Sequence, residues 1–528
     1  MEEAMSSHGL VDPRGLFSAG SFRGGAGRSR RQEMEATGAE GRFGELFTTD
    51  HRPPAHSVSD LTALGVATDS PANPVGLMVE EPNATPEQVD NPGITAGFTF
   101  LGQFVDHDLT FDTTSLGEAA ADVSARENFR TARLDLDSVY GAGPNVSRHL
   151  YGSGDRRFHF VVTETGRVIP QTAINSYDVP RLGDVAVIGD PRNDENLIIS
   201  QIHASFLKFH NFVLDDVRGG ATATAEHFEE ASTEVRWHWQ WLVAHQYLDT
   251  ILGPEAGQRA RAFDPQALGR SGIDFKRLAL GDFMPVEFAG ASFRFGHTQV
   301  RPGYRLNADT AALLFPPDKA TPGLRGGQVI TETLAVDFRR FFAIPGSPVA
   351  PALSRRIDTK LSQALFRLPA VAVGGVEAPS PADQLSVRNL LRGQQLRLPA
   401  GQWVARRLAD TIRHPGFRIR PLTPAEVVRL TPQEAGLPEA EKTRRLNILS
   451  LFSHETPLWF YILKEADVLT GGTRLGPMGE ALVGYVIMTF LHRDPTSYLN
   501  AAPAGWTPRF GTDGDFTMAD LLTRIGAV

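Results

Sequence analysis

Two long stretches of helical periodicity constrain the fold of this chain more than any other feature. Asp194–Val217 and Glu229–Leu252 carry apolar residues at helical spacing over many turns, whereas strand-like alternation is short and scattered. We therefore expect a mainly α fold, a single large helical domain with few short strands. We assign residues 46–528 to this domain. Residues 1–45, rich in Gly, Ser, Arg and Glu, are expected to form a flexible amino-terminal segment.

Composition excludes several classes of function. The chain has no cysteine, which excludes disulfides, zinc–thiolate sites, iron–sulfur clusters and thiol catalysis. Its net charge of -9 argues against a nucleic-acid partner. The longest apolar-rich run, Ala481–Leu491, is well short of the roughly 20 residues of a membrane span and predicts a buried helix. The first residues show no secretory signal, so we expect a cytoplasmic protein or one exported without a recognisable signal.

The segment "FTFLGQFVDHDLTFD" concentrates polar groups in an apolar, helical pattern. Gln103, Asp106 and His107 stand at positions i, i+3 and i+4, so they share one face of the predicted helix. Asp108 points more than a quarter-turn away from His107. The helix could present a histidine, an amide and a carboxylate to one cavity and a second carboxylate elsewhere. A satisfied polar cluster inside a core explains this segment, taken alone, about equally well.

A second cluster places oxygen-bearing residues at alternate positions. In "TARLDLDSVYG", Thr131, Arg133, Asp135 and Asp137 would lie on one side of an extended backbone. Such spacing suits calcium, which binds roughly 6–8 oxygen ligands in irregular geometry. Arg133 could contribute only its backbone carbonyl, and Asp108 would be a natural additional ligand. A solvated acidic strand is the alternative, and it is favoured when the segment is taken alone.

Three further segments carry single candidate residues. "GDPRNDEN" places Arg192 and Glu195 three residues apart at the start of the long helix, where the helix dipole favours a carboxylate. "SFRFGHTQVRP" contains His297, a plausible axial ligand for haem iron in a chain without cysteine. "SVRNLLRGQQLRLPAG" offers Asn389 in a mixed helical pattern. Each of these residues, taken alone, is better explained as structural.

Together the five segments resemble the animal-type haem peroxidases of the peroxidase–cyclooxygenase superfamily. The resemblance runs from about residue 40 to the end, and the order and spacing of the motifs are more specific than any single motif. "GQFVDHD" resembles the distal helix, "LDLDSVYG" the calcium loop and "GDPRNDEN" the catalytic-arginine segment. "FRFGHT" and "RNLLRGQQLRLP" are similar to the proximal segments, and "GPMGEALVGYVIMTFLHRDPTSYL" to bacterial members.

This resemblance implies a role for each candidate residue. His107 matches the distal histidine, Arg192 the distal arginine and Gln103 their companion; His297 matches the iron ligand, and Asn389 the acceptor of its other ring N–H. The carboxylates that form ester links to haem in some relatives align with Asp106 and Glu195. The calcium site aligns with Asp108, Thr131, Arg133, Asp135 and Asp137.

Three positions depart from the family pattern. Asn196 stands where relatives with a sulfonium link to haem have methionine, so we expect no such link. Arg294 stands three positions before His297, where cyclooxygenase-like dioxygenases carry a tyrosine. No tyrosyl radical can form at that position, which weakens a fatty-acid oxygenase function. Asp137 replaces a frequent serine and would make the calcium site more acidic.

The function that the resemblance implies is a haem peroxidase. It would reduce hydrogen peroxide and oxidise small donors, phenols or halides, in the response to oxidative stress. The implied cofactors are haem b and calcium, and the sequence leaves open whether the haem is ester-linked. The alternatives are a haem-dependent fatty-acid dioxygenase of the same superfamily and a haem-binding or adhesion protein without turnover.

Overall fold

A computed structural model describes residues 41–47, 52–68, 75–111, 128–167, 175–265, 273–281, 283–318, 321–369, 383–412 and 417–528. Helices dominate these residues, which confirms the predicted mainly α fold. The α-helices are α3 Val58–Gly65, α4 Pro86–Val89, α5 Gly97–Leu109, α6 Asp137–Tyr140, α7 Leu197–Val217, α8 Ala225–Trp241, α9 Leu248–Leu252, α10 Pro254–Arg261, α11 Ile273–Leu280, α12 Val286–Gly290, α13 Leu385–Gln395, α14 Gly401–Thr411, α15 Pro424–Val427, α16 Glu439–Ser450, α17 Leu458–Thr470, α18 Pro477–Glu480, α19 Val486–Arg493, α20 Tyr498–Ala501 and α21 Met518–Arg524.

The strands are short and, within the described ranges, pair only two at a time. They are β1 Arg42–Gly44, β2 Ala67–Thr68, β3 Val75–Gly76, β4 Asp90–Thr95, β5 Thr163–Arg167, β6 Asn175–Asp178, β7 Arg181–Leu182, β8 Val185–Ala186, β9 Phe283–Pro285, β10 Gly303–Arg305, β11 Ala311–Leu313 and β12 Leu353–Arg355. The pairs are β1–β9, which is parallel, and the antiparallel β10–β11, β12–β4, β2–β3, β5–β6 and β7–β8. Such ribbons hold connecting segments against the helices and form no central sheet.

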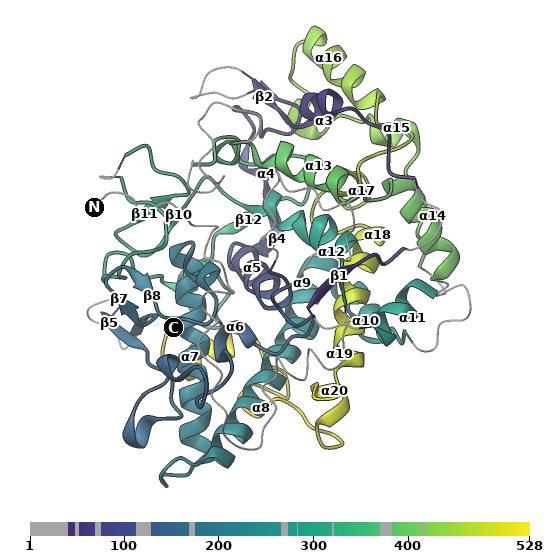
Figure 1. Ribbon diagram of the computed structural model, residues 1–528. Coiled ribbons are helices and arrows are strands. Elements are labelled where there is room, and N and C mark those ends of the chain that lie inside the picture. The colour runs from purple at the N-terminus through teal and green to yellow at the C-terminus, as the bar shows by residue number, and fades with distance from the viewer. Residues whose placement is uncertain are drawn as a thin grey trace, which may run out of the picture.

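Helix α5 lies near the middle of the molecule and places the first polar cluster there (Figure 1). It packs against α7 and against η7 (Ser292–Gln299), a 3₁₀ segment that carries His297. Close packing at α5 depends on small residues, because a Cβ at Gly102 would lie 2.6 Å from the hydroxyl oxygen of Tyr247. The apolar face of α5 is buried, as its helical spacing predicts.

The two long periodic stretches are helical, with boundaries that differ in detail. α7 begins at Leu197 because the Asn196 side chain caps it by accepting from the N–H groups of Ile198 and Ile199. The second stretch consists of α8, a π-helical segment η5 (Leu242–Tyr247) and α9. α7 and α8 pack against each other beside α5.

The apolar run Ala481–Leu491 forms a π-helical segment, η13 (Ala481–Tyr485), continued by α19, and its side chains are buried. Within the described ranges, no helix combines the length and the apolar character needed to cross a bilayer. At the other end of the chain, β1 and the buried Phe43 lie within the last residues of the segment for which the sequence predicts flexibility. Residues 1–40 of that segment lie outside the described residues.

Candidate active site

The shared face of α5 brings its polar residues to the segment that carries Glu195. Gln103 donates from Nε2 to Oε1 of Glu195, and the Nε2 atom of His107 lies 3.8 Å from the same oxygen. The Gln103 amide oxygen accepts from Asn196 Nδ2 at 3.2 Å. Gln103 and His107, which share one face of the predicted helix, therefore both lie close to Glu195. Asn196, at the position of the absent methionine, caps α7 and orients Gln103.

Arg192 is held beside His107 by a short turn, η4 (Pro191–Asp194). Asp190 caps this turn, accepting from the Arg192 N–H at 2.9 Å and from its guanidinium Nη2 at 2.7 Å. Nη2 also donates to the backbone carbonyl of His107 at 3.0 Å. The guanidinium carbon lies 4.2 Å from the centre of the Phe111 ring, a cation–π contact. The planar, permanently charged group is thus fixed in one orientation.

A buried ion cluster lies on this side of the site. Asp190 is fully buried and also pairs with Arg130, whose guanidinium lies 3.5 Å from Asp137 as well. Although burial favours the neutral acid, Arg130 and Arg192 hold the pKa of Asp190 well below its usual range. The Asp190 carboxylate thus links two guanidinium groups and holds that of Arg192 beside His107.

The His107 ring is neutral, and a hydrogen bond at its Nδ1 atom fixes its orientation. Burial, followed by the charge of Arg192, lowers the pKa of His107 to about 3. Its Nδ1 lies 2.8 Å from Oδ1 of the fully buried Asn193 and donates to it. A neutral ring that donates from Nδ1 has an unprotonated Nε2, which can accept a proton.

The two carboxyls that the resemblance links to haem esters both have raised pKa values. Burial raises the pKa of Glu195 to about 7, against the charge of Arg192. The Glu195 side chain nevertheless remains 51% accessible to solvent. Protein atoms therefore surround the carboxyl but leave part of it open. Burial likewise raises the pKa of Asp106, although Arg192 and Arg294 both act in the opposite direction. Since Arg294 belongs to η7, Asp106 lies within electrostatic range of the arginines on both sides of the site. Ester formation at these carboxyls stays a prediction.

His297 and Asn389 are adjacent, as predicted, but the amide is oriented differently. Nδ2 of Asn389 faces Nδ1 of His297 at 2.8 Å, whereas the Asn389 oxygen accepts from Nη1 of Arg294 at 3.2 Å. A guanidinium can only donate, so it attracts the amide oxygen that we expected to face the ring. Burial and the charge of Arg294 lower the pKa of His297 to about 3, which keeps the ring neutral.

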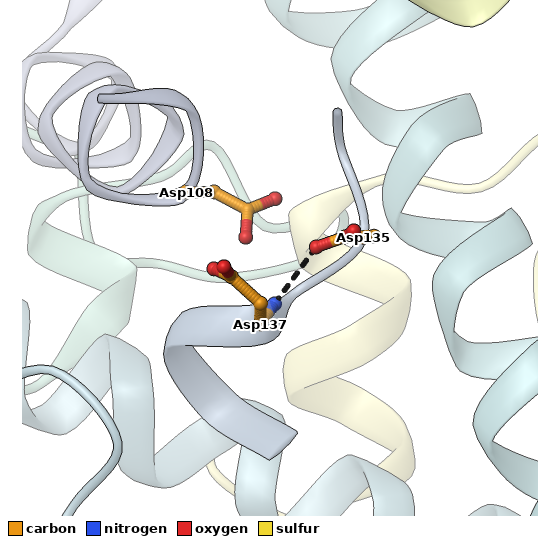
Figure 2. Close-up of side chains that lie close together, drawn as sticks. All are labelled: Asp108, Asp135 and Asp137. Carbon is orange, nitrogen blue, oxygen red and sulfur yellow. Dashed lines mark hydrogen bonds between the residues drawn. The ribbon is translucent and has the colours of Figure 1, made fainter. Parts of the chain in front are cut away.

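Three of the predicted calcium residues converge. One oxygen from each of Asp108, Asp135 and Asp137 lies within 4.8 Å of the others, and Figure 2 shows the three carboxylates pointing toward a common space. Oδ1 of Asp108 is buried without a hydrogen-bond partner among the described residues. Burial and the other two carboxylates raise the pKa of Asp108 well above its usual value. A hard cation would relieve this repulsion and satisfy the unpaired oxygen.

The backbone of this second cluster is not the extended strand that we expected. Leu136 has a left-handed conformation, with φ of 55°, and Asp137 is the first residue of α6. The turn at Leu136 brings Asp135 and Asp137 together. Their carboxylates therefore converge because of this turn and not because an extended backbone places them on one side. The Thr131 hydroxyl donates to Asp135 Oδ2 at 2.8 Å, and the Arg133 guanidinium lies 3.9 Å from Asp494. The structure thus places Thr131 beside the cluster and directs the Arg133 side chain to another carboxylate.

Sequence reasoning missed three residues that orient the site. Asp190 and Asn193 lie inside the quoted "GDPRNDEN" segment, and the Asp-Pro pair was a readable signal of a capped turn. Trp239 donates from Nε1 to Oδ2 of Asp108 at 2.9 Å, over a separation of 131 residues. No local pattern could have revealed that contact.

Comparison with known proteins agrees with this geometry. The family model described as animal haem peroxidase matches residues 112–316, which include Arg192 and His297. The resemblance to the animal haem peroxidases that the sequence motifs indicate is therefore confirmed over these residues. Members of that superfamily are haem enzymes. No curated protein matches the chain significantly.

Two solved structures show the same fold as this chain. Peroxidase A from Dictyostelium discoideum is 14% identical, with a TM-score of 0.53 over 93% of this chain and 94% of that one. A variant of the Oryza sativa fatty acid alpha-dioxygenase, solved with palmitic acid, is 13% identical, with a TM-score of 0.54 over 92% of this chain and 79% of that one. One neighbour is a peroxidase and the other a dioxygenase, so the fold alone does not assign the activity.

The residues at the site fit a haem. Within the described part of the chain, neither His107 nor His297 has a hydrogen bond to its Nε2 atom, while the Nδ1 atom of each ring contacts an asparagine. Both rings are neutral, the state in which imidazole binds a metal or accepts a proton. The half-accessible Glu195 carboxyl lies on the same side as His107.

Proposed function

We propose that this chain is a haem peroxidase that reduces hydrogen peroxide and oxidises small donors such as phenols or halides. The observation that carries the proposal is the pairing of His107, which has an unprotonated Nε2, with an Arg192 guanidinium hydrogen-bonded to the His107 carbonyl. Peroxide cleavage needs a base for one oxygen and positive charge for the other, and this pair supplies both.

Each residue of the pair has a separate task. His107 accepts the peroxide proton at Nε2 and returns it to the leaving oxygen. Arg192 stays charged and stabilises the negative charge that develops there. Gln103, whose amide is held by Glu195 and Asn196, orients a small polar ligand next to the imidazole. A haem supplies the redox chemistry when it is bound.

His297 is the proposed axial ligand, oriented by Asn389. A ring that binds metal through Nε2 carries its proton on Nδ1, so the Asn389 amide must then present its oxygen to the ring. We expect His297→Ala to lose most bound haem in a haemin titration followed by absorbance. His149→Ala, the same change at an exposed histidine, should bind haem as the unmodified chain does. Equal haem binding by both variants would contradict the assignment.

We propose that Asp108, Asp135 and Asp137 bind a calcium ion, with Thr131 and the Arg133 carbonyl beside it. Bound calcium would anchor Asp108, the residue next to His107, and so keep α5 in place. Removing calcium with a chelator should lower the thermal midpoint and the peroxidase rate, and Asp135→Asn should reduce this dependence. Asp155→Asn, at an exposed position, is the control. A chelator-insensitive chain would refute a structural calcium site.

A fatty-acid dioxygenase is the second candidate, since one structural neighbour has that activity. Arg294, at the position of a tyrosine in cyclooxygenase-like relatives, argues against it. Two assays separate the dioxygenase from the peroxidase. Oxygen uptake with linoleate measures the first activity, and oxidation of a small donor by peroxide measures the second. Activity in neither assay by a haem-loaded chain would instead favour a haem-binding protein without turnover.

A further inference from the structure

A second buried histidine, His203, is connected to the distal histidine through one amide. Asn193 accepts from His107 Nδ1 with its oxygen, at 2.8 Å, and its Nδ2 donates to Nδ1 of His203 at 2.9 Å. Asn193 and His203 are both fully buried. The three side chains come from α5, η4 and α7, so they join the three elements that build the site.

His203 has a single hydrogen-bond partner among the described residues. Its Nε2 is buried without a partner there, so the ring is hydrogen-bonded only to Asn193. His210, two turns further along α7, pairs both nitrogens, with the Tyr140 hydroxyl and the Phe158 carbonyl. An unpaired buried polar atom costs free energy that an apolar ring of similar size would avoid. The single contact of His203 with Asn193 therefore needs an explanation of its own.

The chemistry of the amide supplies that explanation. An asparagine has one accepting and one donating end, and a neutral imidazole has one accepting and one donating nitrogen. Burial lowers the pKa of His203 to about 3, so it is neutral. When His203 accepts at Nδ1, the amide must turn its oxygen to His107, which then donates from Nδ1 and leaves Nε2 unprotonated. If the amide were reversed, Nε2 of His107 would carry the proton and could not act as a base.

We propose that His203 acts through Asn193 as a positioning residue that selects the tautomer of His107 in which Nε2 is unprotonated. His203 does not contact the reacting atoms; its contribution is to fix the direction of the Asn193 amide. The edge-on contact of its ring with Phe104, at 6.1 Å and 82°, holds the imidazole against the same helix that carries His107. The contribution of this relay, which consists of His203, Asn193 and His107, to catalysis rests on the proposed peroxidase function.

Nitrogen NMR of the full-length chain labelled with ¹⁵N-histidine tests the tautomer directly, without turnover. A His107→Gln variant assigns the signal. We expect an unprotonated Nε2 at His107 in the unmodified chain and in Asn193→Asp, because a carboxylate accepts from both rings. In Asn193→Leu and His203→Phe we expect a large share of the opposite tautomer. The matched control is His210→Phe, a buried histidine on the same helix, which should leave the His107 signal unchanged.

Two results would overturn the proposal. One is a wild-type tautomer at His107 in His203→Phe, even where Asn193→Leu changes it. The other is an equal change in His210→Phe, which would indicate a general packing effect. If His203→Phe does not fold, His203→Leu tests the same side chain.

The haem-loaded chain offers a second measurement with hydrogen cyanide as the probe, since this ligand must give its proton to a base when it binds. Cyanide association should slow roughly 10-fold or more in Asn193→Leu and His203→Phe, and recover in Asn193→Asp. Unchanged cyanide association in His203→Phe would count against the relay. If the variants change the tautomer but the unmodified chain does not turn over peroxide, the proposed function fails and the relay stands. Peroxide turnover with an unchanged tautomer in the variants rejects the relay alone.

Discussion

At the scale of single residues, the site depends on groups that bind two partners at once. Asp190 caps the turn before Arg192 and pairs with two guanidinium groups. Asn196 caps α7 and holds the Gln103 amide. Each such residue couples local backbone geometry to the position of a functional side chain, so a conservative change at one of them can alter the chemistry without unfolding the chain.

Arg192→Lys tests the fixed guanidinium. Lysine keeps the charge but cannot bond Asp190 and the His107 carbonyl in the same planar geometry. We expect the reaction with hydrogen peroxide to slow by about 10- to 1000-fold with haem content unchanged, measured by stopped-flow absorbance. Arg130→Lys is the matched control, because Arg130 shares Asp190 and has no hydrogen bond to His107 among those that the described residues make. Equal rates in the two variants would show that a positive charge at position 192 supports the reaction without the planar guanidinium.

At the scale of elements, short contacts tie distant segments to the helical framework. β1 pairs with β9, and the segment after β1 is fastened to α12 by Glu287, which accepts from the N–H groups of Leu46 at 2.8 Å and Phe47 at 3.1 Å. Glu287 is buried, and burial raises its pKa to about 7. The burial of this carboxyl therefore makes the stability of the chain depend on pH.

The sign of that dependence follows from proton binding. Between pH 4.5 and about 7 the folded state holds a proton on Glu287 that the unfolded state has lost. The free energy of unfolding must therefore fall as pH rises through this window, by an amount on the order of 3 kcal/mol for a shift of this size. Urea unfolding at several pH values measures it.

Glu287→Gln should reduce the slope in this window by the contribution of one carboxyl, since an amide does not titrate. Glu195 and Glu465, whose pKa values burial also raises to about 7, still contribute. Glu439→Gln, at a side chain that is 88% exposed, should leave the profile as it is. A profile that keeps its slope in Glu287→Gln would show that other carboxyls cause the pH dependence.

At the scale of the whole molecule, the buried core reaches the back of the candidate site. Phe104, fully buried on α5, stacks on Phe206 of α7 at 4.9 Å and meets Trp239 of α8 edge-on at 5.4 Å. Trp239 in turn binds Asp108. The same aromatic packing thus supports the fold, the carboxylate cluster and the orientation of α5.

Phe104→Ala should lower the free energy of unfolding by about 3–5 kcal/mol, because it removes a fully buried ring and leaves a cavity. Chemical denaturation monitored by circular dichroism measures the change. Leu182→Ala, at a residue that is 80% exposed, should change it by less than about 0.5 kcal/mol. A small effect of Phe104→Ala would mean that the neighbouring rings close the cavity.

By itself, the sequence determined the helical class, the shared face of Gln103, Asp106 and His107, and the separate direction of Asp108. These follow from local periodicity, which the backbone geometry of a helix imposes on neighbouring residues. The order of the five motifs likewise indicated the resemblance to the animal haem peroxidases, which the family model confirms over residues 112–316.

The way in which residues distant in the chain orient one another follows from the packing of the helices. This packing turned the Asn389 amide toward Arg294, bent the backbone at Leu136, and placed Asn193 between His107 and His203. These outcomes depend on competition between donors and acceptors that meet only after the helices pack. The hydrogen-bonding capacity of a side chain can be read from its residue type, but its partner is set by the fold.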